Sequence, residues 1–180
     1  MNLPRLFSTR ERVKILAFLL EHPSTKINMN KIARDLKLSP GQIHKYIAIL
    51  RREKIVIDDQ LKESCVTASL RRLMNIKKIL EAGIVKIARS HFPKLKGLGI
   101  FGSWAKGENW EESDLDIWLK LDSEPTDLEV AEAKKAIEKS IRAGLDIVIA
   151  SPKRLKHLHE TSDIFYFSLY NGITIWGEEL

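Results

Sequence analysis

The alternating segment at residues 115–121 constrains the fold of this chain more than any other feature of the sequence. Every second residue from Leu115 onward is leucine or isoleucine, which is the period of a β-strand with one buried face. Asp114 and Asp116 fall on the opposite face. Because a strand that buries one face needs paired strands and a covering layer, the segment predicts a sheet that carries two carboxylates on one side.

Two further segments predict strands of the same sheet. Gly97–Phe101 is a short apolar run that changes direction at Gly102, and Leu145–Ala150 is a second apolar run that contains Asp146. A helix is expected over residues 125–142, between two of the strands. An acid inside so apolar a strand needs a partner, because an unpaired buried carboxylate is strongly disfavoured.

If the strands that hold Asp114, Asp116 and Asp146 are neighbours, three carboxylates converge. A divalent cation best relieves their repulsion, and Mg²⁺ is the candidate because it takes oxygen ligands and substrate phosphates. Two such ions would support in-line phosphoryl or nucleotidyl transfer. Gly102 lets backbone amides approach a triphosphate, and Ser103 adds a hydroxyl donor.

The same residues are open to other interpretations. Gly97, Gly99 and Gly102 satisfy G-x-G-x-x-G, but that motif indicates dinucleotide binding only between a strand and a helix, and here apolar residues fill the loop. The sequence has no Gly-Lys-Ser/Thr, so a Walker phosphate loop is absent. The structural alternative is a solvated strand edge for Asp114 and Asp116, and a lysine-paired acid for Asp146.

Together these segments resemble the minimal nucleotidyltransferases of the DNA polymerase beta superfamily. The resemblance rests on Gly102-Ser103-Trp104-Ala105-Lys106-Gly107, a five-residue spacer, Ser113-Asp114-Leu115-Asp116 and the later Asp146, and it covers residues 84–180. It implies a mixed sheet flanked by helices, both metals bound by Asp114 and Asp116, and Asp146 as third ligand or as base. It also implies that Gly102, Ser103 and Lys106 hold the triphosphate. The family often has arginine where Trp104 and Lys106 stand, and lysine lacks the bidentate fork of arginine.

The amino-terminal half is basic. Residues 1–93 hold 19 Lys/Arg and 8 Asp/Glu, a net +11, whereas residues 94–180 hold 11 and 16, a net −5, which together give the +6 of the chain. A basic half suits a polyanion such as nucleic acid, and an acidic half can hold cations.

Three short helices are expected in the basic half. The first is capped by Ser8 or Thr9, the second by Asn30, and the third begins at Ser39-Pro40. A hairpin is expected next, with strands at Ile55–Ile57 and Cys65–Thr67.

This order of elements, over residues 8–68, looks like a winged helix-turn-helix. In that family the third helix enters the major groove of DNA. Transferred position by position, the resemblance predicts base or phosphate contacts for Gln42, His44, Lys45, Arg51 and Arg52. The alternative is a module for dimerisation or protein docking.

We therefore expect an α/β (α+β) protein in three parts: a winged helix-turn-helix at residues 1–68, connecting helices at residues 69–92 and a nucleotidyltransferase domain at residues 93–180. The tail is expected to form a helix and a last strand that belong to the core. His157 and His159 are expected to be solvated, because residues two apart on a helix do not share a face.

No stretch of the sequence approaches the about 20 apolar residues that cross a bilayer, and no signal peptide follows Met1. We expect a cytoplasmic protein that binds no membrane. The single cysteine, Cys65, excludes an intrachain disulfide, and a half-buried position is expected for it.

The leading hypothesis is Mg²⁺-dependent transfer of a nucleoside monophosphate from an NTP, with ATP preferred, to an acceptor hydroxyl, coupled to DNA binding. The first expected acceptor is a helical, toxin-like protein partner, because small members of the family resemble antitoxins; an RNA 3′ end or a small molecule is second. A homodimer is also expected. The alternative is a transcriptional regulator whose nucleotidyltransferase fold only binds a nucleotide or a partner.

Overall fold

The computed structural model describes residues 3–23 and 25–180. It divides into two compact units, Met1–Arg71 and Arg72–Leu180, and the boundary falls inside helix α5 (Cys65–Glu81). None of the helices in the described ranges is long and apolar enough to cross a membrane.

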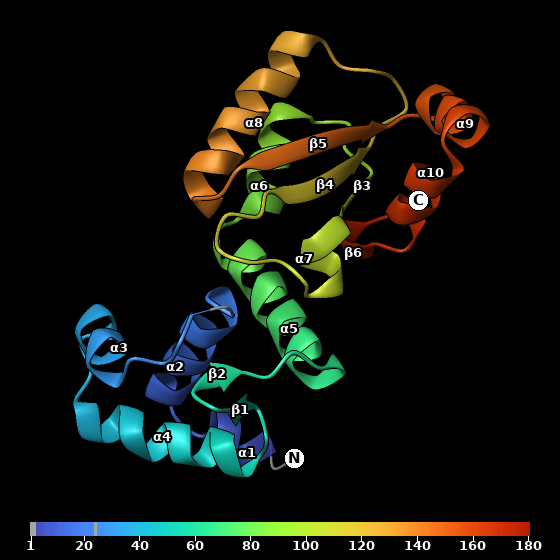
Figure 1. The fold of residues 1–180 in the computed structure, drawn as a ribbon. Coiled ribbons are helices and arrows are strands. Elements are labelled where there is room, and N and C mark those ends of the chain that lie inside the picture. The colour runs from blue at the N-terminus through green and yellow to red at the C-terminus, as the bar shows by residue number, and fades with distance from the viewer. Residues whose placement is uncertain (1–2, 24) are drawn as a thin grey trace. The chain divides into compact units, whose positions relative to one another are not determined.

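The first unit is mainly helical (Figure 1). Its elements before α5 are α1 (Leu3–Phe7), α2 (Arg10–Glu21), α3 (Met29–Leu36), α4 (Pro40–Arg52), β1 (Val56–Ile57) and β2 (Gln60–Leu61). Apolar faces of α2 and α4 form the core, and the buried Tyr46 hydroxyl donates a hydrogen bond to the carbonyl oxygen of Leu6 at 3.0 Å. The winged helix-turn-helix interpretation of this order remains a prediction.

Two local expectations for this unit are wrong. The second strand of the hairpin is Gln60–Leu61, because Asp58 and Asp59 both have positive φ (49° and 56°) and close a two-residue turn. Residues 65–67 instead begin α5, where Ser64 and Thr67 cap the helix through reciprocal hydrogen bonds of 2.9 and 3.3 Å. Cys65 is exposed there, so its expected half-buried position is also wrong.

The N-terminal caps of α2 and α4 are the residues that the sequence predicted, whereas the cap of α3 is not. Thr9 caps α2 as expected, and Ser39 caps α4 with Pro40 in the first turn. The cap of α3 is Asn28 and not Asn30, because the Asn28 side chain accepts the backbone N–H of Lys31 at 3.0 Å.

The second unit is built on a four-stranded sheet in the order β5-β4-β3-β6. The strands are β3 (Gly97–Phe101), β4 (Leu115–Lys120), β5 (Leu145–Ala150) and β6 (Ile173–Gly177). β4 pairs in parallel with β5, whereas β3 pairs antiparallel with both β4 and β6. The sheet is therefore mixed, as the resemblance to the nucleotidyltransferases implied.

Helices cover the sheet on both faces (Figure 1). The larger core joins one face to helices α6 (Ile84–His91) and α8 (Asp127–Ile141). On the other face Phe101 and Trp118 contact Leu169 of α10 (Asp163–Tyr170) and Leu155 of α9 (Pro152–Thr161). The predicted alternation in β4 is thus present, but Trp118 makes its second face buried as well.

The expectation that the tail helix belongs to the core is wrong for most of α10. Leu169 is buried, whereas Ile164 is 90% exposed and Phe167 54% exposed. A helix with apolar residues on every side cannot bury all of them against one sheet face.

Candidate active site

Gly102 stands at the junction of β3 and the short helix α7 (Gly102–Lys106). Its φ is +64°, and a β-carbon built on it would lie 2.1 Å from Oδ2 of Asp116. Both the left-handed backbone and the lack of room require glycine. The turn therefore lets the carboxylate of Asp116 lie directly against the glycine backbone.

A second glycine lies in the same way against Asp114. A β-carbon on Gly144 would lie 1.8 Å from Oδ1 of Asp114. The backbone N–H of Leu115 also donates to the carbonyl oxygen of Gly144 at 2.8 Å, which joins the start of β4 to the residue before β5. Each of the two acids in the Asp-Leu-Asp segment thus occupies space that a glycine leaves open.

Asp146 lies across from Asp116, because the two residues are register partners in the parallel β4–β5 pair. Burial raises the pKa of Asp116, and repulsion from Asp146 and then from Asp114 raises it further. The carboxylates of Asp146 and Asp114 are therefore close enough to Asp116 to oppose its ionisation.

The three acids are not assembled as a set of metal ligands. Within residues 3–23 and 25–180, no group of three or more His, Cys, Asp or Glu side chains is placed so that it could hold a metal ion. Asp146 is instead exposed and lies 3.4 Å from Nζ of Lys134, which is the lysine pairing that the sequence left open. The carboxylate oxygens of the three aspartates are nevertheless of the kind that a hard divalent cation prefers, and such a cation would relieve the repulsion at Asp116.

A buried amide network holds the segment between α7 and β4. The Asn75 side chain of α5 donates to the carbonyl oxygen of Trp104 at 2.9 Å and to Oδ1 of Asn109 at 2.7 Å. The buried Trp104 indole donates through Nε1 to the carbonyl oxygen of Ser113 at 3.2 Å. The residue immediately before Asp114 is therefore fixed to α7. Trp104 therefore belongs to the core of the second unit.

A family model described as "Polymerase beta, Nucleotidyltransferase" matches residues 82–171, which is half of the 180-residue chain. The chain belongs to this nucleotidyltransferase family. The matched range contains the glycine turn at Gly102 and all three aspartates. The resemblance to the polymerase beta superfamily is thereby confirmed for this part of the chain.

Two relatives come from Methanocaldococcus jannaschii. "Putative protein adenylyltransferase MJ1379" is 33% identical over 103 residues, which are 54% of this chain and 99% of that protein. "Putative protein adenylyltransferase MJ1215" is 30% identical over 79 residues, which are 44% of this chain and 90% of that protein. Together with the family match, these relatives identify the protein as a nucleotidyltransferase enzyme.

The nucleotidyltransferase is also similar to solved structures. One of them is a crystal structure described as "the toxin-antitoxin with AMP-PNP", with 23% identity and a TM-score of 0.44. The match covers 58% of this chain and 74% of that chain.

The predicted triphosphate residues of the nucleotidyltransferase lie along α7. Gly102 and Ser103 are its first two residues, and Lys106 is its exposed last residue, followed by Gly107 with φ +73°. The carbonyl oxygen of Lys106 accepts a hydrogen bond of 3.3 Å from the Arg72 guanidinium. Gly102 and Ser103 therefore lie beside Asp116, whereas Lys106 lies at the far end of the helix.

The predicted DNA-binding residues lie on α4 of the nucleotidyltransferase. Four of them are exposed and take no part in capping the helix: His44, Lys45, Arg51 and Arg52. Gln42 differs, because its Oε1 accepts from the backbone N–H of Ser39 at 3.1 Å and completes the capping box. Arg51 forms an ion pair with Asp59 in the hairpin turn. The other three residues of this set, His44, Lys45 and Arg52, belong neither to the helix cap nor to the ion pair with Asp59.

Sequence reasoning missed Asn75, Asn109, Gly144 and Lys134. The sequence carried no signal for Asn75, because the residue lies off the apolar stripe of its helix and its neighbours one turn away include Arg71, Arg72 and Lys78. The helix buries Asn75 and leaves Leu73 51% exposed, so the buried face is rotated from the one that apolar spacing predicts. The other three act through contacts that only the folded chain creates.

Proposed function

We propose that the protein transfers the nucleoside monophosphate of an NTP, with ATP preferred, to a hydroxyl group of a protein partner. The observation that carries the proposal is the pair of carboxylates, Asp114 and Asp116, set against glycine backbone beside Ser103 within the family-matched range. Both relatives are named as protein adenylyltransferases, which supports adenylylation of a protein. RNA 3′ ends and small molecules are the second class of acceptor.

In the proposed reaction the acceptor oxygen forms a bond to the α-phosphorus while the bond from that phosphorus to the pyrophosphate oxygen breaks. Asp146 accepts the acceptor's proton, or it serves as a third ligand while solvent water takes the proton. Gly102 and Ser103 offer backbone amides and a hydroxyl to the triphosphate, and Lys106 offers a cation. Pyrophosphate leaves.

The carboxylates of Asp114 and Asp116 would bind Mg²⁺, with two ions in the site. When bound, it would neutralise charge on the phosphates and on the entering and leaving oxygens. Asp146 would join the set only after its side chain leaves Lys134, since the two groups now lie 3.4 Å apart.

The test is incubation of the full chain with each α-³²P-labelled NTP, Mg²⁺ and candidate acceptors, beginning with the product of the neighbouring gene. We expect label to join the acceptor, and Asp114→Ala and Asp116→Ala each to reduce transfer by at least about 100-fold. Asp122→Ala is the matched control, because Asp122 is an exposed acid paired with Lys96 at 2.7 Å, away from the glycine turn. Transfer that persists in both site variants would refute the proposal.

We further propose that the first unit binds DNA through α4. The supporting observation is that α4 contains three basic residues and no acidic residue, and that Lys45 and Arg52 are exposed on it. The alternative is a transcriptional regulator without catalytic activity, in which DNA binding is the whole activity of the protein.

Replacing Lys45 and Arg52 with alanine is expected to weaken DNA binding equally across sequences and to lower the dependence of log K on log salt by about 1 per residue. Fluorescence anisotropy of the full chain at several salt concentrations measures both quantities. The control of equal charge is the double variant Lys94→Ala with Lys135→Ala, which replaces two exposed lysines of the second unit. An unchanged affinity and salt slope in the double variant would make α4 a docking helix instead.

A further inference from the structure

One face of α10 exposes large apolar side chains. Ile164 is 90% exposed, Phe167 54% and Tyr170 44%. Residues three apart on a helix share a face, and Tyr166 joins the two rings, with centroid distances of 5.6 Å to Phe167 and 4.7 Å to Tyr170. Leu169, on the other side of the helix, packs against the sheet. We call Ile164, Phe167 and Tyr170 the α10 face; a contiguous exposed apolar patch of this kind is typical of an interaction site.

Helix α10 borders the candidate active site. The ring of Phe165 lies edge-on to the ring of Phe101, with centroids 5.9 Å apart. Phe101 precedes Gly102 and is the register partner of Asp116, so the side chains of Phe101 and Asp116 lie on the same face of the sheet. A protein bound to α10 would therefore lie next to the site that its acceptor hydroxyl must reach.

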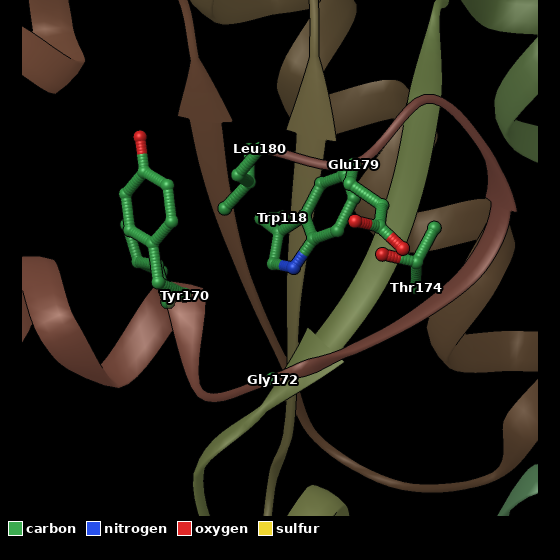
Figure 2. A pocket seen from close by; sticks show the side chains of 7 residues that line it. Trp118, Tyr170, Gly172, Thr174, Glu179 and Leu180 are labelled. Atoms are coloured by element: carbon green, nitrogen blue, oxygen red, sulfur yellow. The ribbon is translucent and has the colours of Figure 1, made fainter.

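The α10 face ends at a recess. A cavity of about 270 Å³ is lined by Trp118 of β4, by Tyr170 of α10, and by Glu179 and Leu180 after β6. Figure 2 shows the Tyr170 ring extending from α10 along one side of this cavity. Tyr170 is thus both the last residue of the α10 face and a wall of the recess. Protein interfaces are commonly anchored by a side chain that fills such a recess.

The neighbouring helix α9 is basic. It contacts α10 directly, because the ring centroids of His159 and Tyr166 are 4.7 Å apart. Its charged side chains, with histidine neutral, are Lys153, Arg154, Lys156 and Glu160, which give three positive charges and one negative, a net +2. Residues 94–180 as a whole have a net charge of −5, and the three cations of α9 are exposed. A partner that covers α10 therefore meets local positive charge, which acidic side chains would complement.

We propose that the α10 face docks the acceptor protein of the transfer reaction. The partner presents an apolar surface flanked by acidic residues, and its acceptor hydroxyl extends past Phe165 toward Asp116. A second copy of this chain is a poorer occupant, because a two-fold contact uses the same patch on both subunits and would bring the positive charges of two α9 helices together. An RNA acceptor would complement α9 but would leave the aliphatic Ile164 uncovered. The inference rests on the proposed nucleotidyl transfer and adds the surface on which its partner binds.

Calorimetric titration of the full chain with the product of the neighbouring gene measures docking without requiring transfer. We expect binding, and we expect Ile164→Ser and Phe167→Ser each to weaken it by about tenfold or more, because each removes an apolar side chain from the interface. Both side chains are more than half exposed in the chain alone, so the fold should tolerate the changes. Leu128→Ser is the matched control, since Leu128 is 68% exposed on α8, which covers the opposite face of the sheet; it should leave affinity unchanged.

The charge of α9 is tested separately by salt. Lys153→Ala with Lys156→Ala should weaken binding by about threefold or more at low ionic strength and should reduce the loss of affinity on adding salt. Lys135→Ala with Lys139→Ala removes the same charge from exposed positions of α8 and should change neither quantity. Equal effects of the two double variants would show that the partner responds to net charge and not to α9, and the assignment of an acidic partner surface would fall.

Three results would overturn docking on the α10 face. They are a wild-type chain that does not bind the probe protein, an affinity unchanged in Ile164→Ser and Phe167→Ser, and light scattering that shows a wild-type dimer which these two variants convert to monomers.

Transfer assays separate this inference from the proposed function. If docking and transfer are both correct, the two variants should raise KM for the acceptor protein and leave kcat unchanged. If the acceptor is labelled with the same KM by the wild type and both variants, nucleotidyl transfer stands and docking on α10 falls. If both variants lose affinity while the bound partner is never labelled, docking stands and nucleotidyl transfer falls.

Discussion

Gly102→Ala is expected to abolish nucleotidyl transfer, with a loss in kcat/KM of at least about 100-fold. An alanine β-carbon would lie 2.1 Å from Oδ2 of Asp116, and the φ of +64° disfavours any residue with a β-carbon. The carboxylate of Asp116 must therefore move away from the turn. Steady-state kinetics below the unfolding temperature of the variant measure the loss.

Two further glycine variants make this result interpretable. Gly41→Ala is the control, because no atom lies within 4 Å of a β-carbon at that position of α4; it should leave transfer unchanged. Gly144→Ala would displace Asp114, at 1.8 Å, without a positive φ at the glycine, and should also abolish transfer. Full activity in Gly102→Ala would show that the position of the Asp116 carboxylate is unimportant.

Asp116→Asn is expected to abolish transfer and at the same time to stabilise the metal-free fold. Burial and repulsion from Asp146 and Asp114 raise the pKa of Asp116, so the folded state binds a proton more tightly than the unfolded state does. The ionised carboxylate therefore destabilises the folded protein at neutral pH, and this effect disappears below about pH 4, where both states are protonated. The variant should unfold about 2 °C or more above the wild type in EDTA at pH 7.

The same variant tests metal binding without an activity assay. Mg²⁺ should raise the unfolding temperature of the wild type, because a ligand that binds only the folded state stabilises it, and should have little effect on Asp116→Asn. Asp122→Ala should respond to Mg²⁺ as the wild type does. A variant that is less stable than the wild type in EDTA, or that gains as much from Mg²⁺, would contradict this account of the site.

Local patterns in the sequence were sufficient for much of the fold. The alternation around Asp116 predicted a strand with two carboxylates on one face, and Gly102 predicted a turn that only glycine tolerates. The second strand of the hairpin was misplaced for a local reason as well: Asp58 and Asp59 adopt left-handed backbone conformations, and the Asp-Asp pair is a weaker signal for that turn than Asn-Gly.

What the sequence could not show depends on contacts between distant segments. The register that places Asp146 opposite Asp116 is a property of the pairing of β4 with β5. The approach of Lys134 to Asp146 requires α8 to be docked on the sheet, so the lysine pairing could be raised as an alternative but not decided. The cavity beside Trp118 depends on β6 and on the segment that follows it, which are more than 50 residues away in the sequence.

The amide network around Asn75 and Asn109 has a consequence for the energetics of catalysis. It ties an irregular segment, residues 107–114, to helices that are already ordered. The conformational entropy of that segment is therefore lost when the chain folds and not when a nucleotide arrives. The loop is therefore already ordered when the substrate binds.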